Sequence, residues 1–475
     1  MKVLLLNLPD MAWSGKGYSA HLGLGYIAAV LERAGHEVKV LDLAVTKELC
    51  RQSYLGAPKF AVREITDFQP DVVGASMTTT NRFNVVYWSK LIKELFPNSK
   101  FIVGGPHILY DAPSTLEYAP TIDCVVKSEG ENTTVELCKA YENGGKTKDI
   151  SGLYIRDSKG KAHDTGNRPF IEDLDSLPFP ARHLFPMKDY DFRIGKFKSV
   201  KTGTAITSRG CPIGCKFCST SHYWGRKYRF RSAKNIVDEI ELVFNDYPFV
   251  REMVFFDDSM TIRRDRVSEI CSEIKNRKLD FDWACWSRVD IVNKPMLEEM
   301  HDAGCSIISF GVESGSQRML ENIGKRTTVE QIKSAIRMCQ DVGIEPRATI
   351  IIGLPGETME DVDKTIKLIR KMAIYPGDVH INCFTMLLPG TPWFEEFQEK
   401  NPDFNWMNPP DRFKETSITD KEGNILIPKI TFSKKQVQEI KDRIKMAKLS
   451  YTVYRYPQYL PRRFWNYMNS CINAM

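Results

Sequence analysis

Apolar runs of strand length alternate with amphipathic segments through residues 1–145. The runs KVLLLNLP, PDVVGASM and SKFIVGGP are continuously apolar, which is typical of strands that are buried on both faces. Segments such as LGLGYIAAVLERAG and RFNVVYWSKLIKELF place apolar residues along one helix face. The pattern predicts a doubly wound α/β domain whose parallel strands end at a ligand crevice.

Residues 146–200 break this alternation. SGLYIRDSKGKAHDTG predicts a small hairpin, and LDSLPFPARHLFP is rich in proline and irregular. We interpret 146–200 as a linker that packs against a neighbouring domain.

Six further strand patterns occupy residues 201–395, and all but the last precede a helical pattern. Six βα units of this length predict a partial (βα)6 TIM-like barrel, whose chemistry lies at the carboxyl ends of its strands. Residues 396–475 predict a small, mostly helical region that contains a helix from about 433 to 455.

The composition of the 475 residues narrows the class of protein. A net charge of +6 without a concentrated basic stripe gives no expectation of a nucleic-acid partner. The first apolar run stops at Asn7, too short for a signal segment, and no run has transmembrane length. We therefore expect a cytoplasmic protein whose 12 cysteines are reduced, most of them as core thiols.

Three cysteines stand apart from the rest, in the segment RGCPIGCKFCST. Cys211, Cys215 and Cys218 have the spacing C-x3-C-x2-C in a loop rich in glycine. A structural zinc site needs four ligands, and His222 is the available fourth. Iron–sulfur clusters also take thiolates from tight loops, and three cysteines on a four-iron cluster leave one iron open. The spacing favours the cluster.

CPIGCKFC resembles the cluster loop of the radical S-adenosylmethionine (SAM) superfamily. The resemblance implies that the three cysteines hold a [4Fe–4S] cluster whose fourth iron chelates the amino and carboxylate groups of SAM. It also implies reductive cleavage of SAM to a 5′-deoxyadenosyl radical.

Four other segments resemble motifs that this family places at successive strand ends: FFDDSM, WSRVDIV, GVESGS and IIGLPGET. The resemblance implies the following SAM contacts: Asp257 and Asp258 near the methionine end, Arg288 at the carboxylate, Glu313 and Ser314 by the ribose or amino group, and Gly353, Pro355 and Gly356 along the adenine.

The first domain resembles the cobalamin-binding domain of one large radical SAM subgroup. The similar segments are LGLGYIAAVLERAGHEV, PDVVGAS, VGGPH and KSEGENT. Small residues there, Gly104, Gly105 and Gly130, allow the backbone to approach a flat macrocycle.

The predicted lower face of the corrin lacks the usual histidine. Other cobalamin proteins ligate cobalt through D-x-H-x-x-G, but no histidine follows two residues after Asp10. We predict cobalamin without a protein histidine ligand, with Asn81 and Arg82 as candidates near the corrin.

Together these resemblances imply a cobalamin-dependent radical SAM enzyme, most simply one that methylates an unactivated carbon of a small molecule or lipid. Ring formation, carbon–carbon joining or oxidation with the same cofactors is the alternative. A cobalamin sensor or electron carrier without catalysis is a third.

Two partners are expected. One is a one-electron reductant such as a flavodoxin or ferredoxin. The tail YTVYRYPQYLPRRFWNYMN mixes aromatic residues with arginines. That mixture is typical of a peripheral membrane contact, although packing onto the barrel also explains it.

Overall fold

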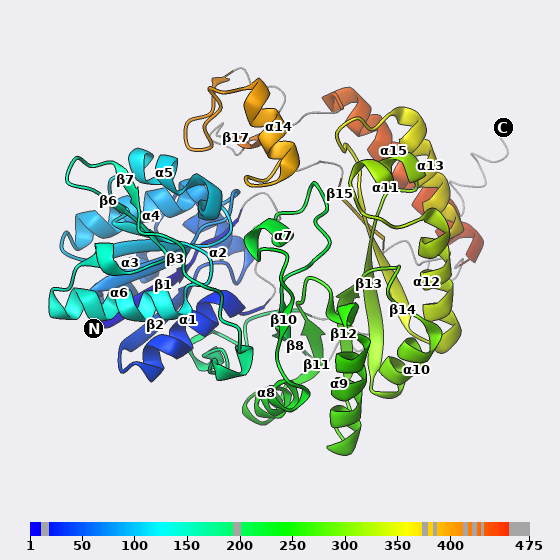
Figure 1. Cartoon of the computed structure of the whole chain (residues 1–475), viewed down its shortest axis with the longest axis horizontal. Helices are drawn as coiled ribbons and strands as arrows, with labels where there is room; N and C mark the ends of the chain where they lie inside the picture. The colour runs from blue at the N-terminus through cyan, green and yellow to red at the C-terminus, as the bar shows by residue number, and fades with distance from the viewer. Residues whose placement is uncertain are drawn as a thin grey trace.

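Two α/β domains lie side by side, and α14 and β17 of a small C-terminal region lie above their junction in the view of Figure 1. The structure is a computed structural model. It describes residues 1–10, 19–192, 201–372, 379–382, 387–411, 417–419, 425–428 and 432–455.

The first domain contains a sheet whose five parallel strands run in the order β2-β1-β3-β4-β5. This order is that of a doubly wound sheet and confirms the predicted fold. Val3, Leu4 and Leu6 of β1 are completely buried because helices cover both faces. The elements are β1 (Lys2–Asn7), α1 (Leu22–Arg33), β2 (Glu37–Asp42), α2 (Lys47–Ser53), α3 (Lys59–Phe68), β3 (Val72–Ser76), α4 (Arg82–Leu95), β4 (Lys100–Gly104), α5 (Ile108–Tyr118), β5 (Cys124–Val126) and α6 (Glu131–Asn143).

The predicted hairpin extends this sheet. β6 (Leu153–Arg156) pairs antiparallel with β5, and β7 (Ala162–Asp164) pairs with β6. The first domain therefore continues past the predicted boundary at residue 145. Residues 174–181 of the linker pack on α1, where the Ala181 N–H donates to the Gly25 carbonyl over 3.0 Å.

The second domain is a half-barrel of six parallel strands in the order β15-β14-β13-β12-β11-β8, as predicted. Its core lies between the sheet and the outer helices, and Cys271, Cys285, Cys305 and Cys339 are buried there as core thiols. The main elements are β8 (Lys201–Ala205), α8 (Ala233–Asp246), β11 (Val250–Phe255), α9 (Arg264–Asn276), β12 (Asp282–Ser287), α10 (Lys294–Asp302), β13 (Cys305–Glu313), α11 (Gln317–Asn322), α12 (Val329–Val342), β14 (Glu345–Ile351), α13 (Met359–Lys371) and β15 (Val379–Asn382).

Shorter elements follow β8. These are β9 (Ser208–Arg209), the short helix α7 (Thr220–Tyr223) and β10 (Arg229–Phe230), which pairs antiparallel with β9. The cysteine loop runs from β9 to α7, so it lies at the mouth of the half-barrel as predicted.

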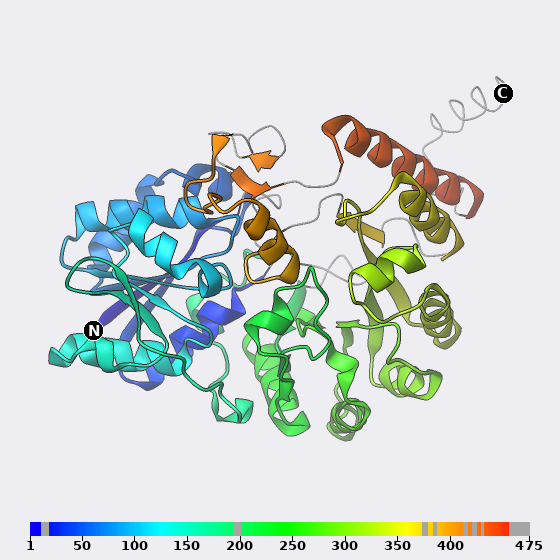
Figure 2. The same ribbon diagram turned by 45° about the horizontal axis from the view of Figure 1, so that its top comes forward.

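The C-terminal region spans both domains. Helix α14 (Pro392–Lys400) lies between the two halves in Figure 2, and α15 (Lys434–Arg455) packs on α13. The region also holds the hairpin of β16 (Ser417–Thr419) and β17 (Ile425–Pro428). Among the described helices, none is long and apolar enough to cross a membrane.

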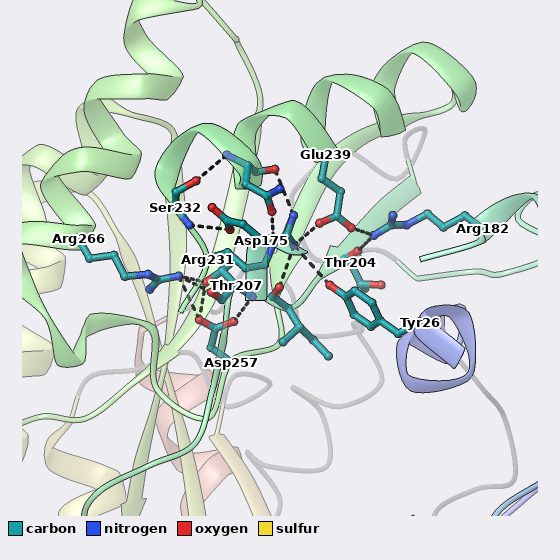
Figure 3. A network of polar contacts seen from close by, with 12 residues as sticks. Tyr26, Asp175, Arg182, Thr204, Thr207, Arg231, Ser232, Glu239, Asp257 and Arg266 are labelled. Carbon is teal, nitrogen blue, oxygen red and sulfur yellow. Dashed lines mark hydrogen bonds and ion pairs between the residues drawn. The ribbon is translucent and has the colours of Figure 1, made fainter. Parts of the chain in front are cut away.

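A buried carboxylate network fastens the linker to the barrel (Figure 3). Glu239 of α8 is fully buried and accepts hydrogen bonds from Arg182 of the linker and Arg231 beyond β10. Burial would raise the pKa of Glu239, but the two guanidinium groups lower it below its usual value. Arg231 also lies 3.4 Å from the Tyr26 hydroxyl of α1, so the network reaches the first domain.

Replacement of this carboxylate should destabilise the protein. Glu239→Gln leaves Arg182 and Arg231 buried without their counter-ion, and we expect the free energy of unfolding to fall by about 3 kcal/mol. Asp238→Asn on the same helix is the matched control, because its carboxylate pairs with Lys234 and Arg277 near the surface. Urea unfolding of both variants measures the difference; equal midpoints would contradict the prediction.

Candidate functional site: a cysteine loop beside a glycine-lined cleft

A cavity of about 320 Å³ opens where the two domains meet. The first domain lines it with the carboxyl ends of β3, β4 and β5, and the barrel adds residues from β9, α7 and the end of β11. A second cavity of about 400 Å³ adjoins it and shares His21, Gly23, Ser76, Ile206 and Phe256. The crevice therefore lies at the predicted edge of the sheet.

The three predicted glycines all line the first cavity. Gly105 has φ of +114°, and a Cβ there would lie 2.6 Å from the Met77 carbonyl oxygen. A Cβ on Gly104 would meet nothing closer than 3.9 Å, so the bare backbone faces open space. Gly130 packs its backbone against Ile27. This wall is shaped for a broad, flat ligand such as a corrin.

Asn81 and Arg82 have different surroundings. Asn81 lines the second cavity, but its side chain holds the β3–α4 turn: Nδ2 donates to the Ser76 carbonyl and Oδ1 accepts from Thr78 N–H. Arg82 is fully buried, and its Nε donates to the Trp406 carbonyl over 2.9 Å. The structure thus places Arg82 at the joint with the C-terminal region and away from the corrin cleft.

His21 borders both cavities. Its Nδ1 accepts the Leu24 N–H at 3.1 Å and caps α1, and burial lowers the pKa of the ring. A neutral imidazole that accepts at Nδ1 carries its proton on Nε2, which then has no lone pair for a metal. This arrangement suits a cobalt without a histidine ligand, which stays a prediction.

The cysteine loop depends on two glycines in the left-handed region. Gly210 has φ of +103°, and a Cβ there would lie 1.8 Å from the Lys227 carbonyl oxygen; Gly214 has φ of +77°. Burial raises the pKa of each of the Cys211, Cys215 and Cys218 thiols. Nucleophilic or redox cysteines show the opposite shift, so these thiols do not have the character of nucleophiles.

The loop has the form of a cluster site. Among the residues that the structure describes, no three His, Cys, Asp or Glu side chains converge where one ion would sit. Cysteines that each bind a different iron need no such common point. The side chain of His222, the alternative zinc ligand, lies outside the described part of the chain.

The adjacent carboxylates after β11 have different roles. Asp257 is buried, and its oxygens accept from the Thr207 N–H at 2.6 Å, with Arg266 3.8 Å away (Figure 3). They also accept from the Ser208 hydroxyl at 2.5 Å. Asp257 therefore holds the strand that leads into the cysteine loop and does not line the cavity.

Asp258 opens into the cavity and accepts the Gly210 N–H at 3.2 Å. Burial of its carboxyl within the cleft raises its pKa to about 6. Its position beside the start of the cysteine loop fits the predicted contact with SAM.

The two predicted site residues of the β13 motif, Glu313 and Ser314, have different surroundings. Glu313 and Arg288 meet near the cysteine loop: Lys325 Nζ donates to Glu313 Oε1 over 2.6 Å, and Arg288 donates to the Lys325 carbonyl over 2.8 Å. The Arg288 Nε is buried without a partner and is available to an acceptor. Ser314 is fully buried, and its hydroxyl lies 3.2 Å from Thr365 Oγ1 of α13, so the structure does not bring it to the site.

The glycine turn after β14 is organised by a carboxylate that the sequence reasoning did not single out. Glu357 Oε2 accepts the N–H groups of Gly353 and Leu354 at 2.6 and 3.2 Å. Arg318 and Asn322 donate to the carbonyls of Gly356 and Pro355, which fixes the turn predicted along the adenine.

An ion network between the domains was also missed. Arg209, which precedes the cysteine loop, donates to Glu129 and Glu131 of the first domain over 2.6 Å each. Arg229 donates to both oxygens of Glu129 over 2.9 Å. Burial would lower the pKa of Arg209, but the two carboxylates raise it. In the sequence, the charged residues of KSEGENT and RGC were the signal that could have indicated this network.

Comparison with known proteins decides the family. Residues 205–369 match the family model described as the radical SAM superfamily, and residues 12–138 match the B12 binding domain. An uncharacterized methyltransferase of Pyrococcus horikoshii is 34% identical over 368 residues, which cover 78% of this chain and 76% of the relative. The chain belongs to the radical SAM superfamily. Its barrel is the radical SAM domain, and the domain before it is a B12-binding domain.

Two other similar proteins show the range of the group. An anaerobic magnesium-protoporphyrin IX monomethyl ester cyclase of Rubrivivax gelatinosus is 33% identical over 353 residues, 73% of this chain and 61% of the cyclase. The solved structure of the radical SAM methyltransferase TsrM of Kitasatospora setae has a TM-score of 0.73 at 19% identity and covers 94% of this chain and 90% of its own. That similarity supports the fold.

The cofactors of this radical SAM enzyme are a [4Fe–4S] cluster, SAM and cobalamin. The residues present fit all three groups. The loop supplies three thiols, the unpartnered Arg288 Nε suits a carboxylate, and the glycine wall suits a corrin.

The adjacent carboxylates give a matched test. Asp257→Asn should lower the free energy of unfolding by about 2–3 kcal/mol, because it removes a buried acceptor from Thr207, Ser208 and Arg266. Asp258→Asn should not lower it, since that carboxyl faces the cavity and its surroundings already oppose its charge. Urea unfolding of the two variants measures the contrast, which equal losses would contradict.

Glu357 should make stability depend on pH. Burial raises its pKa from 4.5 to about 7, so between these values the folded chain keeps a proton that the unfolded chain has released. The contribution of Glu357 to the free energy of unfolding therefore decreases as pH rises through that window. Glu357→Gln should flatten this decrease when thermal midpoints are compared from about pH 5 to about pH 8. Parallel profiles for both proteins would refute it.

Proposed function

We propose that this radical SAM enzyme transfers a methyl group to an unactivated carbon of a small-molecule or lipid substrate. The observation that carries the proposal is the cavity walled by both domains, with Gly104, Gly105 and Gly130 on one side and Asp258 and Arg209 on the other. The relative from Pyrococcus horikoshii, which is named a methyltransferase, adds support.

The protein's part in this reaction is to bind, orient and exclude water. When bound, the cluster supplies the electron for cleavage of SAM, and cobalamin supplies the methyl group. Cys211, Cys215 and Cys218 would hold the cluster. Arg288 would pair with the SAM carboxylate, which suits a guanidinium with an unused N–H.

The cavity wall keeps the reacting groups away from bulk water. Ile206, Phe256 and Trp224 line it from the barrel, and Leu24 and Val126 line it from the B12-binding domain. Apolar walls of this kind protect reactive intermediates from side reactions with solvent. The Gly353–Gly356 turn would lie along the adenine, where its backbone is held by Glu357, Arg318 and Asn322.

A second candidate reaction is ring closure or oxidation with the same cofactors. The cyclase of Rubrivivax gelatinosus, at 33% identity, favours it. The residues that bind the cofactors would be common to both reactions, so the product must distinguish them. A non-catalytic role is disfavoured by the predicted SAM-contact motifs, which include Asp258, Arg288 and Glu313.

Two partner proposals accompany the function. A flavodoxin or ferredoxin would deliver single electrons. Peripheral membrane contact would involve the tail, of which residues 456–475 lie outside the described part. Liposome binding that is lost on truncation after residue 450 would support this contact, and unchanged binding would remove it.

Anaerobic reconstitution tests the reaction. The protein would be loaded with iron, sulfide and methylcobalamin and supplied with SAM, a strong reductant and a metabolite extract from cells that lack the gene. Mass spectrometry should find 5′-deoxyadenosine and a product 14 mass units heavier than a consumed metabolite. Deoxyadenosine with a product that has lost hydrogen but gained no methyl would favour cyclisation or oxidation.

Loss of the cysteines should separate the two cofactors. Cys211→Ala, Cys215→Ala and Cys218→Ala should each abolish SAM cleavage because each thiol binds one iron. Cobalamin binding should persist, since the glycine wall lies mainly in the other domain. Iron content and the corrin visible spectrum provide the measurement, and Cys271→Ala in the core of the barrel is the control. Joint loss of corrin and iron would contradict this separation.

A further inference from the structure

A buried lysine lies beside Glu313, the carboxylate at the end of β13 that is predicted to contact SAM. Lys325 follows α11, and its Nζ donates to Glu313 Oε1 over 2.6 Å. Both side chains are less than a tenth exposed. An ion pair withdrawn from water to this degree strengthens a fold only when its geometry and remaining hydrogen bonds are good, so its place at the mouth of the barrel needs a reason.

The backbone around Lys325 joins the other parts of the site. Its carbonyl accepts a hydrogen bond from Arg288 of the β12 end over 2.8 Å. Two residues earlier, the Ile323 carbonyl accepts the Lys216 N–H of the cysteine loop over 3.0 Å. Lys325 therefore lies where the cysteine loop, Arg288 and Glu313 converge.

Glu313 itself is held in an unfavourable conformation. Its φ is +62°, in the left-handed region that residues with a Cβ seldom adopt. Gly311 makes room for the pair, because a Cβ there would lie 2.5 Å from both Glu313 Oε1 and Lys325 Nζ. Strain of this kind persists only where surrounding contacts fix the residue, and it collects at ligand sites.

We propose that Lys325 is a positioning residue, which fixes the Glu313 carboxylate so that it accepts hydrogen bonds from the ribose hydroxyls or ammonium group of SAM. The inference rests on the proposed SAM contact of Glu313 and adds a residue that acts through it. Without Lys325, the carboxylate would lose its ion-pair partner, and it would turn toward another donor or lose its fixed direction. In either case the aligned acceptor is lost.

The test measures SAM binding to the reconstituted, oxidised [4Fe–4S] protein by anaerobic equilibrium dialysis. It also records the change that SAM causes in the electron paramagnetic resonance spectrum of the reduced cluster. Glu313→Gln and Lys325→Met should each weaken SAM binding at least tenfold and diminish the spectral change. The double variant should bind SAM about as tightly as whichever single variant binds it less tightly, because both substitutions remove the same interaction.

Three further variants make the result decisive. Lys325→Arg should restore much of the affinity because it keeps the charge. Gly311→Ala should cause the same loss of SAM affinity, because the added methyl group pushes Glu313 and Lys325 apart. This variant tests the role of Lys325 if Lys325→Met does not fold. Lys333→Met on α12 is the control: it removes a lysine paired with Glu330 at the surface and should leave binding unchanged.

The outcomes separate the inference from the function on which it rests. Weak binding in Glu313→Gln with normal binding in both Lys325→Met and Gly311→Ala would overturn the role of Lys325 alone. Additive losses in the double variant would also overturn it, since Lys325 would then act independently of Glu313. Normal binding in Glu313→Gln would overturn the SAM contact and the inference together, while the cluster and corrin spectra would still report the cofactors.

Discussion

The site depends on the ion network that Arg209 forms between the two domains. Its guanidinium is buried between Glu129 and Glu131 of the B12-binding domain, and the next two residues begin the cysteine loop. Tyr223, just after that loop, donates its hydroxyl to the Ser128 carbonyl over 3.1 Å. Both ends of the cluster loop are thus tied to the loop that borders the corrin cleft. These buried contacts fix the spacing between the cysteine loop and the cleft.

Such an arrangement suits chemistry between two large cofactors. A radical reaction needs its centres held in one orientation and away from water. Buried charge pairs contribute little net stability but are costly to break, so they oppose alternative domain positions. Glu239 forms buried ion pairs with Arg182 and Arg231, so a second ionic contact connects the linker and the barrel. The domains meet through defined ionic contacts in addition to apolar packing.

Most of the fold was predictable because it follows from local periodicity. Buried parallel strands are continuously apolar and the covering helices are amphipathic, so both β/α domains and their order followed from the sequence. The hairpin β6–β7 was also predicted, but its pairing with β5 was not, since an edge strand offers hydrogen bonds to any partner. The predicted strand ends brought Asp258, Arg288, Glu313 and the three cysteines to one mouth.

The amino-acid sequence by itself determined the chemistry: a three-cysteine loop, a motif at each strand end and a glycine-lined crevice. The tertiary structure decided which member of each motif faces the cleft. Asp257 and Ser314 bond to neighbouring elements, Asp258 lines the cavity, Glu313 pairs with Lys325, and Arg82 joins the C-terminal region. Lys325 and Glu129 became visible only through partners 12 and 80 residues away. The reason is physical: motif spacing reports the local backbone, whereas the direction and charge of a side chain depend on distant partners.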